Sequence, residues 1–291
     1  MSAARGASRG TARARARTRG AGRAGWGLYA ALTAIALLSL APLLYMARVS
    51  LGVGGDLPIA PSDWWGRPFS LAHYRDLWHG GPMARFALNS VLVTGVAVPL
   101  QLLLAAAAGH ALARTRFLGR GALLALATAF LILPKQVLLA PLYLLFANTG
   151  LLDSYAALIL PHLADPFGVL FMAHYYQTLT PELEEAARTD GLSPAAIFWR
   201  IVLPVSGPGL AVVGVNGFLT TWNAFLHPLV LTTSESMRTL PVGLALFAQS
   251  EHRVDWGALL AGSTVATVPV VLAFLFFQRQ IVEGILKGSS R

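Results

Sequence analysis

The chain of 291 residues contains no cysteine and little charge, since charged residues make up only 12% of it. Without cysteine the chain has no disulfide bond, no thiolate metal ligand and no thiol nucleophile. A soluble globular domain carries about 25% charged residues. Here 55% of the residues are hydrophobic and the mean hydropathy is +0.60. This balance predicts an all-α, polytopic membrane protein.

Acidic residues are also missing from the first 25 positions, which hold seven arginines interleaved with Ala, Gly, Ser and Thr. Much of the formal charge of +9 therefore belongs to this segment. We expect residues 1–25 to form a disordered tail and residues 26–291 to form the transmembrane domain. Because the tail abuts a hydrophobic run, it is more simply an orientation signal than a nucleic-acid-binding arm, and no nucleic-acid partner is expected.

Six apolar stretches are long enough to cross a bilayer, which takes about 20 residues of helix. The first is interpreted as a retained span, because no small-x-small cleavage site of a signal peptide follows it. Prolines inside these stretches are tolerated where neighbouring helices satisfy the freed backbone groups. The predicted spans are 27–47, 88–112, 121–143, 153–177, 207–231 and 257–278.

Lysine and arginine predict the orientation. With the N-terminus in the cytoplasm, the inner segments hold fifteen basic residues and the outer segments six. The positive-inside rule therefore places both termini in the cytoplasm, although the margin depends on the arginine-rich tail. This orientation also puts the loop of residues 178–206 in the cytoplasm.

That loop is acidic and polar, and its sequence predicts two short helices. The first is expected to begin at Thr180–Pro181, a cap followed by a proline, with glutamates in its first turns and an end at Gly191. The second is expected to begin at Ser193–Pro194 and to end at Pro204. Composition alone is compatible with an ordinary solvated connector. The small side chains of Ala186 and Ala187 would instead let a partner protein approach closely.

The spacing within the loop favours the second interpretation. It resembles the EAA loop, E-A-A-x3-G-x9-I-x-L-P, of binding-protein-dependent ABC importer permeases. Further stretches, including "FSLAHYRDLW", "LPKQVLLAPLYLL" and "WNAFLHPLVL", resemble the carbohydrate-uptake subfamily, so the likeness covers about residues 65–288. The positions that match the loop signature are Glu185, Ala186, Ala187, Gly191, Ile201, Leu203 and Pro204.

The resemblance implies the fold of a type I ABC importer permease in the bacterial inner membrane. It implies a second related permease, two ATP-binding cassette ATPases and an extracytoplasmic solute-binding protein as partners, with a sugar-like solute. In such systems the EAA loop is a coupling helix lying in a cleft of the ATPase, a role carried here by Glu185, Ala186, Ala187 and Gly191. The chain has no Walker A pattern, so it is not expected to be an enzyme or to need a cofactor.

Polar residues inside the spans are candidates for the solute pathway, since they are costly in lipid. Asp165, flanked by Pro166 and Gly168, could accept hydrogen bonds from sugar hydroxyls, although it could equally pair with Lys135. Trp222 could stack on a sugar ring, but helix packing is the simpler role. His110 and His174 lack a ligand partner at helical spacing, so no metal site is predicted. The pathway candidates are Asp165, Asn216, Thr220 and Asn223.

Other functions stay open on the residues alone. An ABC permease for a non-sugar solute, such as a polyamine or a phosphonate, would have the same coupling loop. An ion-coupled secondary transporter is less favoured, because no inverted repeat is visible and the acidic loop would have no role. A membrane enzyme would need clustered carboxylates or histidines at one interface, which the sequence does not show.

Overall fold

The computed structural model describes the backbone of residues 4–57, 66, 68–79, 81–250 and 254–288. Side chains are described over the same ranges except residues 4–25, 250 and 279–288. All regular elements in these parts of the chain are helices. The fold is therefore all-α over the described residues, as the composition predicts.

Four helical stretches are long and apolar enough to cross a membrane. They are Trp26–Ser50 within α1 (Ala4–Ser50), α4 (Met83–Arg114), Tyr155–Thr178 and Trp256–Gln278 within α15 (Trp256–Gly288). The third joins α7 (Tyr155–Leu163) to α8 (Pro166–Thr178). Two bent helix pairs raise the count to six if each is one span. The predicted first, second, fourth and sixth spans are thus confirmed as apolar helical stretches.

The predicted third span is broken in the middle. Helix α5 (Arg120–Ile132) ends where Leu133 and Pro134 take extended backbone angles. The next segment, η1 (Lys135–Leu138) continued by α6 (Leu139–Asn148), is bent by 104° relative to α5. Proline lacks an N–H group and disfavours helical angles in the residue before it. The single helix expected over 121–143 is therefore two helices that point in different directions.

The predicted fifth span also differs from the structure. Helix α12 covers Gly207–Trp222, and a separate short helix, α13 (Leu226–Leu231), follows the break at Asn223–Phe225. Sixteen residues rise only about 24 Å, which is short of the hydrocarbon core of about 30 Å. The helix pair that is long enough joins α12 to the preceding segment Pro194–Val205, with a bend of 77°.

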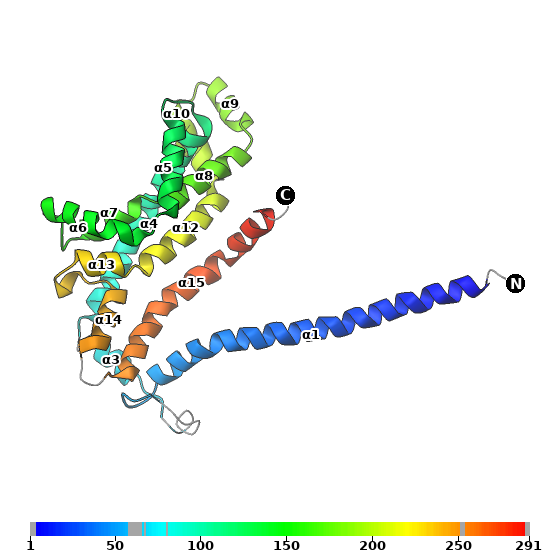
Figure 1. Cartoon of the computed structure of the whole chain (residues 1–291), viewed down its shortest axis with the longest axis horizontal. Coiled ribbons are helices and arrows are strands. Elements are labelled where there is room, and N and C mark those ends of the chain that lie inside the picture. Colours follow the sequence, from blue (N-terminus) through cyan, green and yellow to red (C-terminus); the bar gives the residue numbers. More distant parts are fainter. Residues whose placement is uncertain (1–3, 58–65, 67, 80, 251–253, 289–291) are drawn as a thin grey trace.

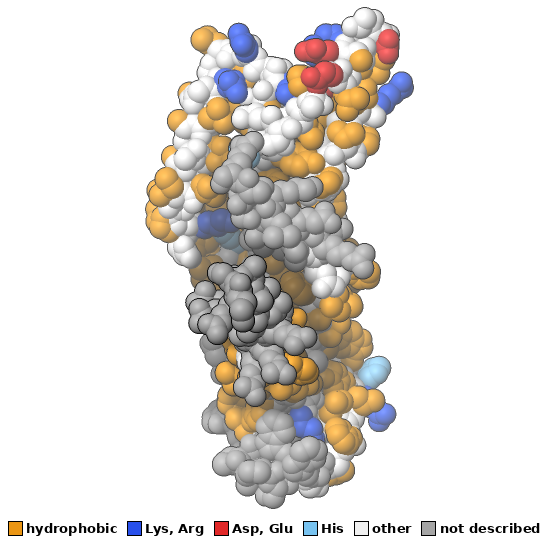
Figure 2. Space-filling model, turned by 90° about the vertical axis from the view of Figure 1, so that its right-hand side faces the viewer, with side chains coloured by type: hydrophobic (Ala, Val, Ile, Leu, Met, Phe, Trp, Pro, Cys, Tyr) orange, Lys and Arg blue, Asp and Glu red, His pale blue; other side chains and the backbone are white. Residues whose placement is uncertain are grey.

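The loop of residues 178–206 lies at one end of the bundle, and the helices of residues 72–79 and 240–250 lie at the other. Figure 1 shows α9 (Glu182–Thr189) and α10 (Pro194–Ile197) at one end, and α3 (Ala72–His79) and α14 (Leu240–Ser250) at the other, with α4 running between them. Charged side chains gather at the α9 end of the surface in Figure 2, and the coloured side chains below that end are mostly hydrophobic. This distribution suits a bundle whose middle faces lipid.

Helix α1 extends away from the rest of the bundle (Figure 1), and the 18-residue apolar window within Trp26–Ser50 has no buried residue. The backbone of the arginine-rich stretch continues this helix from Ala4, where the sequence predicts a disordered tail. The side chains of residues 1–25 lie outside the described residues. The state of the tail therefore stays a prediction.

Asp153, in the turn before α7, forms hydrogen bonds with the segment that follows α13. Asp153 has a positive φ of 56°, and its Oδ1 accepts hydrogen bonds from the amides of Thr233 and Ser234, each at 3.0 Å. Its own amide donates to the carbonyl of Leu231 at 2.9 Å. Hydrogen bonding to the Ser234 side chain and to both amides lowers the pKa of Asp153. The turn before α7 is thereby fixed to the segment after α13.

The centre of the bundle is the close contact between α4 and α8. A Cβ atom added at Gly109 of α4 would lie 2.6 Å from Cβ of Met172 and 2.8 Å from the amide nitrogen of Ala173 in α8. Such distances are shorter than van der Waals contact, so only glycine allows this approach. Small residues at helix interfaces are a general device for close packing in membranes.

We predict that Gly109→Ala destabilises the helix bundle, whereas Gly95→Ala in the same helix does not, because a Cβ at Gly95 meets nothing within 4 Å. Overpacking costs about 1–3 kcal/mol, which outweighs the gain of about 0.5–1 kcal/mol from replacing a helical glycine by alanine. The apparent Tm of each variant in detergent micelles measures the difference. Equal Tm values for the two variants would contradict the close approach of α4 and α8.

Candidate functional site

The loop of residues 178–206 forms a knob of two short helices, as its sequence predicts. Helix α9 has three glutamates in its first turn, where the helix dipole favours negative charge. Gly191 has a φ of +83°, a conformation natural to glycine at a helix end. The predicted cap at Thr180 is wrong, because α9 begins at Glu182 and its cap position is Pro181, with no capping hydrogen bond from a side chain.

The second helix begins as predicted but continues further. The Ser193 hydroxyl accepts a hydrogen bond from the amide of Ala196, with Pro194 in the first turn. The prediction that this helix ends at Pro204 is wrong. A π-helical turn, η2 (Phe198–Val202), leads into α11 (Leu203–Val205), so the run ends at Val205, with Ser206 at its cap position. Proline lies in the first turn of α11, a position where its missing N–H is tolerated.

The residues of the EAA signature divide between the surface and the interior of the knob. Ala187 is 5% exposed and belongs to an apolar core with Tyr176 and Ile197. The expectation that Ala187 faces a partner is therefore wrong, because this residue holds α9 onto its own subunit. Ile201 and Leu203 are half-buried. The exposed members are Glu185, Ala186, Gly191 and Pro204.

A buried carboxylate that the sequence reasoning missed fixes the knob to α4. Glu184 is 8% exposed, and its Oε1 accepts a hydrogen bond from Nε of Arg114 at 3.0 Å. Its Oε2 lies 3.1 Å from Nε2 of His110. Arg114 also donates from Nη2 to the carbonyl of Leu179 at 2.8 Å. We call Glu184, Arg114 and His110 the clamp. The spacing of His110 and Arg114, one helical turn apart, was the feature of the sequence that could have indicated a carboxylate partner.

Two large apolar side chains project from the knob. Leu183 is 57% exposed and Trp199 is 56% exposed. Both lie in a segment that the charge pattern places in water, where such exposure is unfavourable. Exposed apolar groups beside polar ones mark surfaces that bind another protein. The sequence carried this signal for Leu183, which stands between glutamates, but not for Trp199, which lies within the apolar run of residues 194–205.

A cavity of about 750 Å³ lies at the middle of the bundle. Its size falls within the range of roughly 300–1,000 Å³ that is typical of ligand pockets. Three interruptions of the helices line it: the residues after the Pro134 bend, the break between α7 and α8, and the break between α12 and α13. Of the predicted pathway residues, Asp165, Thr220 and Asn223 line this cavity, whereas Asn216 is not among the residues that form its wall.

Asp165 caps a helix inside the membrane region instead of pairing with Lys135. Its Oδ2 accepts hydrogen bonds from the amide of Gly168 at 2.9 Å and from Nε2 of Gln101 at 2.8 Å. A cap of this kind satisfies one of the free amides at the start of α8. Among the described residues Lys135 forms no ion pair.

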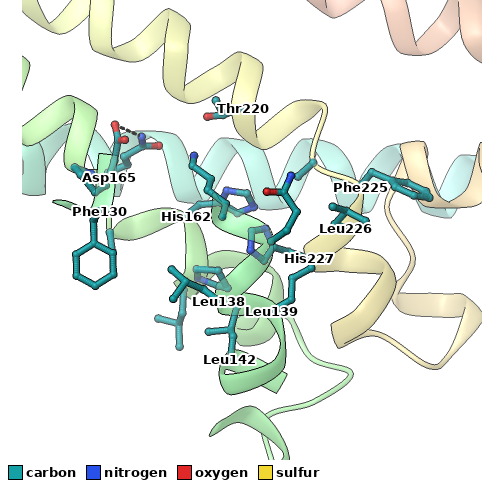
Figure 3. A pocket seen from close by; sticks show the side chains of 18 of the residues that line it. Phe130, Leu138, Leu139, Leu142, His162, Asp165, Thr220, Phe225, Leu226 and His227 are labelled. Carbon is teal, nitrogen blue, oxygen red and sulfur yellow. Dashed lines mark hydrogen bonds between the residues drawn. The ribbon is translucent and has the colours of Figure 1, made fainter. Parts of the chain in front are cut away.

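Two histidines of the cavity were also missed by the sequence reasoning. His162 of α7 and His227 of α13 have ring centroids 6.1 Å apart in an edge-to-face arrangement. Figure 3 shows them side by side, with Asp165 on the side of His162 away from His227. They lie 65 residues apart in sequence, so no local pattern could have joined them.

Trp222 packs between helices, which confirms the simpler of its two readings. Its side chain is 5% exposed, its ring stacks on Phe218 with centroids 5.8 Å apart, and its Nε1 donates to the carbonyl of Ala266 at 2.9 Å. This tryptophan therefore joins α12 to α15 and does not line the cavity.

Comparisons with known proteins agree with this architecture. Residues 101–287 match the family model described as "Binding-protein-dependent transport system inner membrane component". The chain is 40% identical over 200 residues to the arabinooligosaccharides transport system permease protein AraQ of Halalkalibacterium halodurans, covering 69% of this chain and 71% of the relative. It is 32% identical over 269 residues to the diacetylchitobiose uptake system permease protein NgcG of Streptomyces coelicolor, covering 90% and 88%.

A solved structure shares the fold. A chain from the crystal structure of a bacterial ABC transporter involved in the import of the acidic polysaccharide alginate superposes with a TM-score of 0.74. The match covers 88% of this chain and 95% of that chain, at 21% sequence identity. The family match spans well over half of the sequence, and the relatives are permease subunits, not enzymes. The chain therefore belongs to the binding-protein-dependent transport system inner membrane components, the multi-pass permease subunits of ABC importers.

Proposed function

We propose that this permease forms half of a pathway for a sugar or an oligosaccharide into the cytoplasm. Its partners would be a second related permease, two ATP-binding cassette ATPases and an extracytoplasmic solute-binding protein. The names of its relatives, which refer to arabinooligosaccharides and diacetylchitobiose, support the class of solute. The observation that carries the proposal is the knob, whose exposed face has no role within a single subunit.

The knob is suited to docking in a cleft of the ATPase. The outer face of α9 presents the carboxylate of Glu185 beside the small side chain of Ala186, and Leu183 projects at its flank. A carboxylate can pair with a basic residue across an interface, and an exposed leucine gains from burial there. Trp199 adds a second apolar contact from the neighbouring turn.

Motion of the knob would pass to the spans through two attachments. The clamp joins α9 to the inner end of α4, and the apolar core around Ala187 joins it to α8 and α12. Both attachments are buried, so a displacement of α9 is resisted by packed side chains and charged hydrogen bonds. Rigid-body transitions of this type use packed elements that shift together. The helices α8 and α12 lead directly to the breaks that line the cavity.

We predict that the knob faces the cytoplasm. The chain has no cysteine, so a single introduced thiol reports its own location. In intact cells a membrane-impermeant maleimide is expected to label Ser236→Cys, at the opposite end of the bundle, and to leave Thr189→Cys in α9 unlabelled. Both positions are exposed. Lysis should make Thr189→Cys reactive. Labelling of Thr189→Cys in intact cells would reverse the orientation and end the coupling role of the knob.

We predict that Glu185→Lys abolishes ATP-driven uptake and weakens retention of the ATPase, while the permease still inserts. The change replaces a partner-facing carboxylate by an opposite charge. Gly191→Pro should act likewise, because proline cannot adopt the φ of +83° found there. Uptake of a radiolabelled arabino-oligosaccharide into vesicles and copurification of the ATPase measure both effects.

Glu182→Lys serves as the matched control, since it makes the same change of charge in the first turn of α9. It should leave more activity than Glu185→Lys. An equal loss would mean that the charge of α9, and not the carboxylate of Glu185, matters. Uptake by the unaltered complex that survives ATP depletion and stops with the ion gradient would favour a secondary transporter.

We predict that Glu184→Ala and Arg114→Ala each lower the amount of solute imported per ATP hydrolysed, because either change loosens α9 from α4. Removing one partner of a buried ion pair costs about 3–5 kcal/mol. The double variant should lose less than the sum of the single losses, since the two residues act through one contact. Simple additivity of the two effects would show that the clamp does not transmit the motion.

A further inference from the structure

Lys135, a cation without an ion-pair partner among the described residues, lines the cavity together with the imidazole rings of His162 and His227. Import of a neutral sugar would not by itself require these three side chains. Lys135 follows the bend at Pro134. Among the described residues neither imidazole donates or accepts a hydrogen bond, and Lys135 has no carboxylate partner. An ionisable side chain at membrane depth is costly unless it is paired or lines a solute pathway.

The three groups come from three separate helix interruptions. Lys135 lies after the break in the third span, His162 lies just before the break between α7 and α8, and His227 lies just after the break between α12 and α13. The His162 and His227 rings are 6.1 Å apart, and Lys135 lines the same cavity. Hydrogen-bond donors therefore converge on one part of the wall.

The carboxylate in the same cavity is already satisfied. Asp165 accepts two hydrogen bonds at its Oδ2, from Gln101 and from the amide of Gly168 at the N-terminus of α8. Helix N-termini offset negative charge. Its Oδ1 remains available as an acceptor for a hydroxyl group. Figure 3 shows Asp165 separated from His227 by His162, so the acceptor lies at one side and the donors lie next to it.

We propose that this cavity selects a saccharide that carries an acidic group, such as a carboxylate, a sulfonate or a phosphate. The anion lies against Lys135, His162 and His227, and neighbouring hydroxyl groups donate to Asp165. Leu138, Leu139 and Leu142 form an apolar wall beside the two histidines, as Figure 3 shows. This inference rests on the proposed function, because it names the class of solute that the same pathway carries.

The binding of matched acidic and neutral sugars to the purified four-subunit complex in lipid nanodiscs tests the proposal. The probes are digalacturonate against galactobiose, glucose 6-phosphate against glucose, and 6-deoxy-6-sulfoglucose against 6-deoxyglucose. The solute-binding protein is left out, so that its own specificity does not enter. Equilibrium dialysis with radiolabelled sugars gives each Kd. We expect at least one acidic probe to bind about tenfold or more tightly than its neutral counterpart, because hydrogen bonds to charged groups are roughly twice as strong as neutral ones.

Substitutions then show which side chains cause the preference for acidic over neutral sugars. Lys135→Met should bring the acidic probe to the affinity of the neutral one, while Lys135→Arg should keep the preference. His162→Phe and His227→Phe, which retain an aromatic ring, should each reduce it. Arg116→Met removes one positive charge from an exposed loop outside the cavity and should leave the preference unchanged.

Equal binding of acidic and neutral sugars, failure of every acidic probe to bind, or an unchanged preference in Lys135→Met would each overturn the proposal. These outcomes leave the proposed function standing if the complex still performs ATP-driven uptake with its binding protein. Conversely, loss of ATP dependence would remove the proposed function whatever the result of the dialysis. The distribution of affinities among the three acidic probes identifies the anionic group.

Discussion

Lipid offers no hydrogen-bond partner to a peptide group, so a chain that crosses a bilayer stays helical unless protein or water satisfies the freed groups. In this permease three hydrophobic stretches are nevertheless interrupted, at Pro134, at Asp165 and around Asn223. All three interruptions line the same cavity. The cavity therefore lies where the helices stop, and residues of the three interruptions line it.

The opposite requirement governs the α9 end of the molecule. A knob that couples an ATPase to the spans, as we propose, must not move independently of them, and its interior is built accordingly. The small side chain of Ala187 is buried in the subunit core, and Glu184 is held by two cationic or polar partners from α4. Only the outward residues of α9 remain open to a partner. The same short helix thus has one face committed to its own subunit and another free for docking.

The cavity and the knob are connected by the same two helices, α4 and α8. Helix α4 carries Gln101 at the cavity and Arg114 at the clamp, and α8 runs from Asp165 to the loop that leads to α9. The tight approach at Gly109 binds α4 to α8 between these two points. A displacement of the knob would therefore change the geometry of the cavity through packed helices and would need no flexible linker.

Hydrophobic length, caps and glycine turns act locally, so the class of fold, the four long apolar stretches and the two-helix knob could be predicted from the amino-acid sequence. It also pointed to Asp165, Thr220 and Asn223, since polar groups in apolar runs are visible without a structure. Three features could not be predicted in this way: Ala187 faces inward, Asp165 accepts from Gln101 instead of pairing with Lys135, and His162 lies against His227. Those contacts join residues far apart in the chain, and the direction of a helix after a break such as Leu133–Pro134 depends on packing against other helices, which no local pattern encodes.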